Sequence, residues 1–79
     1  MNRSEYAIRM IEREIERIAV SQFPNDEFCT GLIQMAYGQA DITDEQEREL
    51  TRRAAFITRK RRDDLREQHI QDVIRRSAA

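Results

Sequence analysis

The segment "RRAAFITRKRR", from Arg52 to Arg62, holds the residues of this 79-residue sequence that are best suited to recognition chemistry. On a helix, five of these side chains share one face, where an aromatic ring is surrounded by positive charge. The five are Arg52, Arg53, Phe56, Arg59 and Lys60. Aromatic and arginine side chains are enriched at the energetic centres of protein–protein interfaces. We therefore predict that this face binds a partner protein.

The same segment offers an alternative function, which is nucleic-acid binding through Arg59, Lys60, Arg61 and Arg62. Their guanidinium and ammonium groups can bind phosphates, while the ring of Phe56 stacks on a base. Any such binding must be local, because the whole chain has a net charge of −1 and no general attraction to polyanions.

Acidic residues at helical spacing favour protein binding over nucleic-acid binding. Glu49 precedes Arg52 by three residues and Asp64 follows Lys60 by four, so ion pairs along the helix can neutralise much of the positive charge. A helix-turn-helix docking mode is excluded, because the helix that would enter the groove begins with acids at positions 44, 45 and 47. Only a side-on contact through residues 59 to 62 remains for the alternative.

Residues that catalyse reactions or hold metals are sparse. Cys29 is the only cysteine and His69 the only histidine, so the chain can form neither an internal disulfide nor a Cys/His zinc cluster. Cys29 is most simply a small core residue and His69 a surface residue. The segment "DITDEQE" lacks the glycine of a calcium loop, and there is no glycine-rich phosphate loop or nucleophile elbow. We predict a protein that is not an enzyme and uses no cofactor and no metal.

The distribution of charge predicts a cytoplasmic protein without a membrane segment. Charged residues interrupt the N-terminal twenty residues, so no apolar region of a signal peptide is present. A single unpaired cysteine fits a reducing compartment. The stretch from Phe28 to Ala40 has no charged side chain, but it is well short of the roughly 20 apolar residues that a spanning helix needs.

The elements that carry these residues are predicted to be three helices in one domain covering residues 1–79, so the fold class is all-α. The first helix, at about 3–21, begins with a capping pattern of Asn2 and Glu5. Its isoleucines at positions 8, 11, 15 and 18 have the spacing of a helix that packs along a narrow seam. Pro24 then ends this helix.

The second helix is predicted at about 26–37 and forms the uncharged centre of the domain. Asn25 or Asp26 can cap it, and one side carries its apolar residues. That side is expected to consist of Phe28, Leu32, Met35 and Ala36. Gly31 suggests a close helix crossing, and Gly38 is placed to end the helix in a left-handed conformation.

The third helix is predicted at about 44–76, long and highly charged, and begins with a capping box of Thr43 and Gln46. Its inner face contains Leu50, Ala54, Ile57 and Leu65, whereas three later apolar residues lie largely on the opposite side. These are Ile70, Val73 and Ile74. Either the helix breaks between residues 62 and 64, or its last turns pack on something else.

A homodimer is the prediction that accounts for these leftover residues. A 79-residue domain buries a small core, and a second copy supplements it without disulfides or metals. Acids dominate from position 41 to 49 and bases from 52 to 62, so two antiparallel third helices crossing at small residues would place opposite charges together. The predicted interface is Ala54, Ala55, Ile70, Val73 and Ile74. Alternatively, the two alanines pack under the first helix.

The run "NDEFCTGLIQMAYGQADITDEQERELTRR", within a short arginine-rich helical chain, resembles the small accessory proteins encoded in the early regions of lambda-like phages and prophages. The likeness covers about the first sixty residues. It implies a protein of the bacterial host cytoplasm that binds a host or phage protein and thereby shifts the developmental decision or the host cell cycle. It assigns no functional residue.

Overall fold

The computed structural model describes residues 1–78, which form three α-helices and no strand. Helix α1 spans Arg3–Ala19, α2 spans Glu27–Gly38 and α3 spans Asp44–Ala78. The prediction of an all-α fold with three helices is confirmed, and the predicted ranges agree with these bounds to within two residues.

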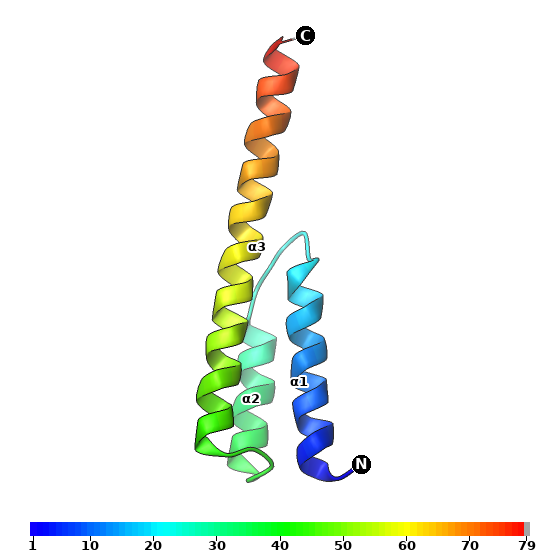
Figure 1. Cartoon of the computed structure of the whole chain (residues 1–79), viewed down its shortest axis with the longest axis vertical. Helices are drawn as coiled ribbons and strands as arrows, with labels where there is room; N and C mark the ends of the chain where they lie inside the picture. The colour runs from blue at the N-terminus through cyan, green and yellow to red at the C-terminus, as the bar shows by residue number, and fades with distance from the viewer. Residues whose placement is uncertain (79) are drawn as a thin grey trace.

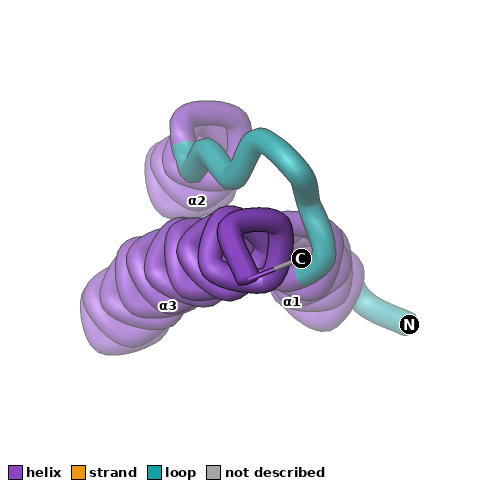
Figure 2. Tube along the Cα trace, turned by 90° about the horizontal axis from the view of Figure 1, so that it is seen from above, coloured by secondary structure: helices purple, strands orange, loops and turns teal. Residues whose placement is uncertain are grey.

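Helix α3 is far longer than the two helices that pack on it. The three helices run alternately up and down, and α1 and α2 lie side by side against the first half of α3 (Figures 1 and 2). Beyond the α1–α2 connection, α3 continues without a neighbour to the C-terminal end, so that the molecule measures 56 × 21 × 15 Å. Residues 62 to 64 are helical, so α3 does not break there.

The core consists of small and branched side chains from all three helices. Those of Ile11 and Ile18 in α1 and of Cys29 and Ile33 in α2 are at most 1% exposed, and Leu50 and Ala54 of α3 close the core. The isoleucine seam predicted for α1 is therefore confirmed, as is the inward position of Leu50 and Ala54.

Local hydrogen bonds explain where the helices begin. The Asn2 side chain accepts a bond of 2.8 Å from the Glu5 amide, and Asn25 accepts one of 2.7 Å from the Glu27 amide. Before α3, Thr43 Oγ1 accepts from the Gln46 amide at 3.1 Å, and Gln46 Oε1 accepts from the Thr43 amide at 2.9 Å. This reciprocal pair confirms the predicted capping box.

The face of α2 that enters the core differs from the predicted one. Cys29, Ile33 and Ala36 are buried, whereas Phe28 is 63% exposed and Met35 61%. The apolar residues of α2 surround most of the helix, so their periodicity did not define one inner face. The positions of α1 and α3 select the side that is buried, and of the four predicted inner residues only Ala36 is buried.

The two glycines also differ from expectation. A Cβ atom at Gly31 would meet nothing within 4 Å, so Gly31 does not mark a close crossing inside the molecule. Gly38 has no positive φ, and the left-handed residue is Ala40, with φ of 60°. The cost of Gly31 to the helix, about 1 kcal/mol relative to alanine, has no intramolecular compensation.

The predicted dimer crossing at Ala54 is wrong. Ala54 is 1% exposed and belongs to the core beneath α1 and α2, so a second chain cannot approach it. Ala55 is half-buried. For Ala54 the alternative interpretation, packing within the monomer, is the correct one.

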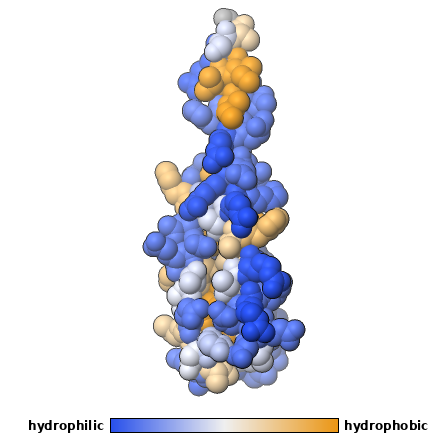
Figure 3. Space-filling model, turned by 90° about the vertical axis from the view of Figure 1, so that its left-hand side faces the viewer, coloured by the Kyte–Doolittle hydropathy of each residue, from blue (hydrophilic) through white to orange (hydrophobic). Residues whose placement is uncertain are grey.

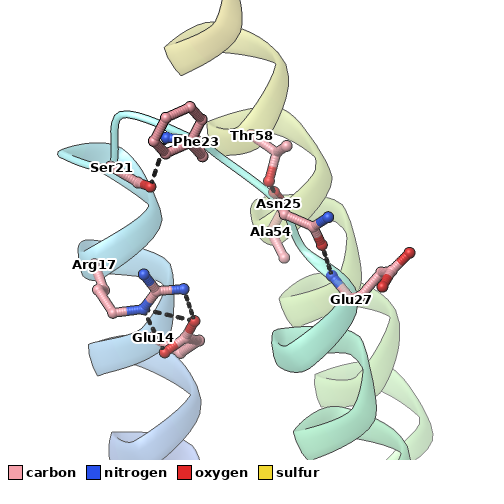
Figure 4. A network of polar contacts seen from close by, with 8 residues as sticks. All are labelled: Glu14, Arg17, Ser21, Phe23, Asn25, Glu27, Ala54 and Thr58. Atoms are coloured by element: carbon pink, nitrogen blue, oxygen red, sulfur yellow. Dashed lines mark hydrogen bonds and ion pairs between the residues drawn. The ribbon is translucent and has the colours of Figure 1, made fainter.

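Within residues 1–78, every buried side-chain nitrogen or oxygen atom has a hydrogen-bond partner, and Figure 4 shows part of this network. Glu14, only 8% exposed, accepts two bonds from Arg17 Nε at 2.9 and 3.0 Å and one from Nη2 at 2.6 Å. Thr58 donates its hydroxyl to the Ala54 carbonyl at 2.8 Å. Burial, together with the negative charges of Glu14 and Asp26, raises the pKa of the Cys29 thiol to about 11, so this thiol is protonated and unreactive at neutral pH.

We expect Ile33→Ala to lower the free energy of unfolding by about 2–5 kcal/mol, because it leaves a cavity among fully buried side chains. Met35→Ala, two positions further along the same helix, should cost less than about 1 kcal/mol because its side chain is mostly in water. Urea denaturation followed by circular dichroism measures both. Equal losses would contradict the assignment of the buried face of α2.

Candidate interaction surfaces

All five residues of the predicted partner-binding patch lie exposed on α3, with Phe56 61% exposed. The charges around the ring are largely neutralised. Arg52 pairs with Glu49 at 2.7 Å and Lys60 with Asp64 at 3.0 Å, as the spacing predicted. Arg53 pairs instead with Glu12 of α1 at 3.1 Å and so ties α3 to α1. Within residues 1–78, Arg59 forms no ion pair.

Two of the four residues named for nucleic-acid binding have a structural role. Arg61 Nε donates to the Ser21 carbonyl at 2.8 Å, and Arg62 Nη2 donates to the Pro24 carbonyl at 3.3 Å. Both carbonyls belong to the α1–α2 connection, which lies beside α3 at this level (Figure 1). Arg61 and Arg62 therefore hold the connection, whereas Arg59 and Lys60 are exposed to solvent. This division reduces the positive charge that is available to phosphates.

The three apolar residues predicted for a dimer interface lie on the part of α3 that has no neighbour. Ile70 and Val73 are each 43% exposed and Ile74 is 56% exposed. Figure 3 shows an apolar patch near the C-terminal end of the molecule, surrounded by polar side chains. Their exposure agrees with the prediction that these residues have no partner inside the monomer.

The predicted partner-binding patch around Phe56 and the apolar patch of Ile70, Val73 and Ile74 lie on one face of α3. Ile70 follows Phe56 by fourteen residues, which at 100° per residue places both on nearly the same line along α3, with Val73 and Ile74 beside it. We call this line the outer face of α3, because it is opposite the core residues Leu50 and Ala54. It consists of Arg52, Phe56, Arg59, Asp63, Arg66, Ile70, Val73 and Ile74.

A second surface, a groove between α1 and α2, was missed from the sequence. It has a volume of about 400 Å³ and is lined mainly by Tyr6 and Met10 of α1, by Leu32 and Met35 of α2 and by Met1. All three methionines of the chain therefore contribute to it. The signal in the sequence was the uncharged stretch from 28 to 40, which we interpreted as core although Leu32, Met35 and Ala36 line this groove.

The side chains considered for metal binding or reactivity lie apart from one another in the part of the chain that the structure describes. Within residues 1–78, no group of three His, Cys, Asp or Glu side chains is placed to hold a metal ion. Cys29 is enclosed in the core and His69 is exposed on the unpartnered part of α3. A hydrogen bond of 2.5 Å to Asp44 raises the pKa of Tyr37, which keeps its hydroxyl protonated. None of the described helices is both long and apolar enough to cross a membrane.

Comparison with known proteins gives no relative: no family model, no curated protein and no solved structure matches this chain.

We expect Arg61→Ala to lower the free energy of unfolding by about 1.5–3 kcal/mol, because it removes a charged donor from the Ser21 carbonyl. Arg59→Ala, which removes the same charge from a residue that pairs with none of residues 1–78, should change stability by less than about 0.5 kcal/mol. Thermal denaturation at fixed ionic strength distinguishes the two variants. If both have wild-type stability, Arg61 does not hold the connection.

Proposed function

We propose that this chain is a non-enzymatic protein–protein interaction module that acts as a homodimer through the outer face of α3. The observation that carries the proposal is the exposure of Phe56, Ile70, Val73 and Ile74 on one side of a helix that extends beyond the two helices packed against it. Exposed apolar side chains arranged along one face are characteristic of interaction sites.

The unpartnered length of α3 supports association. Residues 62 to 78 extend past the α1–α2 connection, which at 1.5 Å per residue is roughly 25 Å of helix. An isolated helix of this length is marginal in water and gains most of its stability from packing of an apolar face. The ion pairs along it, such as Asp63–Arg66 at 3.7 Å and Asp72–Arg75 at 3.8 Å, are exposed and contribute little.

An antiparallel arrangement suits the order of residues on the outer face. When position 56 of one chain lies opposite position 73 of the other, Phe56 contacts Val73 and Ile74 of the second copy. The same register places Asp63 opposite Arg66 of the second copy, twice by symmetry, at the centre of the interface. A parallel pair would instead place Asp63 beside Asp63 and Arg59 beside Arg59.

The proposed context of this module follows from the resemblance to accessory proteins of lambda-like phages. Such a protein acts in the bacterial cytoplasm by occupying the surface of a host or phage protein. The neutralised surroundings of Phe56 support binding to protein rather than to phosphates, because three of the four cations of the patch already have acidic partners.

We expect Ile70→Glu and Ile74→Glu to convert a dimer to a monomer, because each buries an unpaired carboxylate at the proposed interface. Gln68→Glu adds the same charge on the opposite side of the helix and should leave the dimer intact. Light scattering across a dilution series gives the molar mass. A wild-type chain that remains monomeric at every concentration would refute the dimer.

The register is tested by disulfide formation. Phe56→Cys combined with Val73→Cys should produce a covalent dimer on mild oxidation, while Phe56→Cys alone should not, since antiparallel pairing separates the two Phe56 positions by roughly 25 Å. The native Cys29 does not interfere, because it is buried and protonated. Efficient cross-linking of the single variant would indicate a parallel pair.

Nucleic-acid binding, the alternative function, is tested by titrating labelled DNA and RNA at two salt concentrations. We expect no binding even at low salt, because Lys60 is paired with Asp64 and Arg61 and Arg62 are bonded to main-chain carbonyls. Binding whose affinity falls steeply with salt, and which Arg59→Glu abolishes, would instead support phosphate contacts.

A further inference from the structure

The groove between α1 and α2 is separate from the outer face of α3 and has the composition of a helix-binding site. Met10 and Met35 are 40% and 61% exposed at its sides, and Tyr6 is 60% exposed. Unbranched thioether side chains change rotamer at little cost and adapt to the surface of a partner. Phe28, 63% exposed, lies one turn before Leu32 and continues the apolar line along α2.

Gly31 lies on this same exposed side of α2 and has no explanation within the monomer. It stands one turn from Phe28 and from Met35, and a Cβ atom there would be in open space. Glycine in the middle of a helix is unfavourable, and small residues on a helix surface allow another helix to approach its backbone closely. The close crossing that the sequence indicated at Gly31 is thus available to an external helix.

Charged residues border the groove on the side of α1, whereas the part of α2 that lines it carries none. On α2, residues 28 to 40 carry no charge. On α1, Arg13 follows Met10 by one turn and has no ion pair among the described residues, whereas Arg3 at the other end pairs with Asp41 at 3.2 Å. Arg17, one further turn along α1, keeps 59% of its side chain exposed although it bonds to Glu14.

We propose that the groove between α1 and α2 binds an amphipathic helix of another protein, which places apolar residues on Met10, Leu32 and Met35 and acidic residues toward Arg13. The apolar residues of such a helix recur at intervals of three and four, the spacing of anchors in helix-in-groove recognition. Its backbone crosses α2 at Gly31. The acids form ion pairs with α1, because α2 offers no cation.

The test uses two labelled, hydrocarbon-stapled helical peptides of about eighteen residues, or five turns. Both carry leucines along one face; one has glutamates beside that face and the other has lysines at the same positions. Fluorescence anisotropy against the full chain should show the acidic peptide binding at least about tenfold more tightly than the basic one. Equal affinity for both peptides, or no binding of the acidic peptide to folded protein, would overturn the proposal.

Three variants test the individual contacts, and a fourth is their control. Gly31→Leu fills the crossing point while favouring the helix, and Met35→Glu opposes an acidic ligand; each should weaken the acidic peptide about tenfold or more. Arg13→Glu should reverse the preference, so that the basic peptide binds more tightly. Phe23→Glu is the matched control, since it exchanges an 89% exposed aromatic outside the groove and should leave both affinities unchanged. Circular dichroism verifies that each variant is folded.

A second copy of this chain is the other possible occupant of the groove. Repeating the peptide titration on the Ile74→Glu variant, which disrupts the proposed dimer, distinguishes it from a helix of another protein. Unchanged peptide affinity in that variant supports a groove that is independent of pairing through α3. If Met35→Glu or Gly31→Leu instead lowers the molar mass measured by light scattering, the groove is filled by a second copy and the proposal of a foreign helix is wrong.

Discussion

The difference in length between α3 and its two neighbours is the constraint on which the other features of this molecule depend. Helices α1 and α2 have 17 and 12 residues, and α3 has 35. The core therefore forms against only one half of α3 and includes few fully buried side chains. Because α1 and α2 do not reach the second half, its isoleucines and valine are exposed among the described residues.

The basic run in α3 has two roles because it lies where the core ends. Arg61 and Arg62 turn toward the α1–α2 connection and bond its carbonyls, which have no helical partner at that point. Arg52, Arg59 and Lys60 are exposed and lie three or four residues from Phe56 on the same helix. One basic segment thus combines a structural contact with a proposed recognition surface, and the number of its positive charges does not separate the two roles.

Sequence reasoning identified what depends on local chemistry. The capping box at Thr43, the cap at Asn2 and the isoleucine seam of α1 follow from neighbours three or four residues apart, and all three are present. The lengths of α1 and α3 follow from the same signals. The position of the exposed apolar residues of α3 was also predicted, because a helical projection places them opposite Leu50 and Ala54.

What failed depends on contacts between helices. Helix α2 is apolar around most of its circumference, so only the placement of α1 and α3 decides that Ile33 is buried and Met35 is not. The groove was missed for the same reason. It lies between two helices, and the residue pattern of one helix does not predict where the other lies. Ala54 was assigned to a dimer because its small size suits a crossing, although small size equally suits a position beneath α1.

The two proposed surfaces have a geometric relation that bears on how such a module would act. The groove lies near the start of α1, at the end of the molecule far from the C-terminus (Figure 1). Antiparallel pairing through the outer face of α3 therefore places the two grooves at opposite ends of an elongated dimer. One short helix cannot reach both, so the dimer would join two partner molecules, or two separated segments of one. In the second case the affinity of each groove would be multiplied by the effective concentration that the dimer imposes, and an individual groove of modest affinity would suffice.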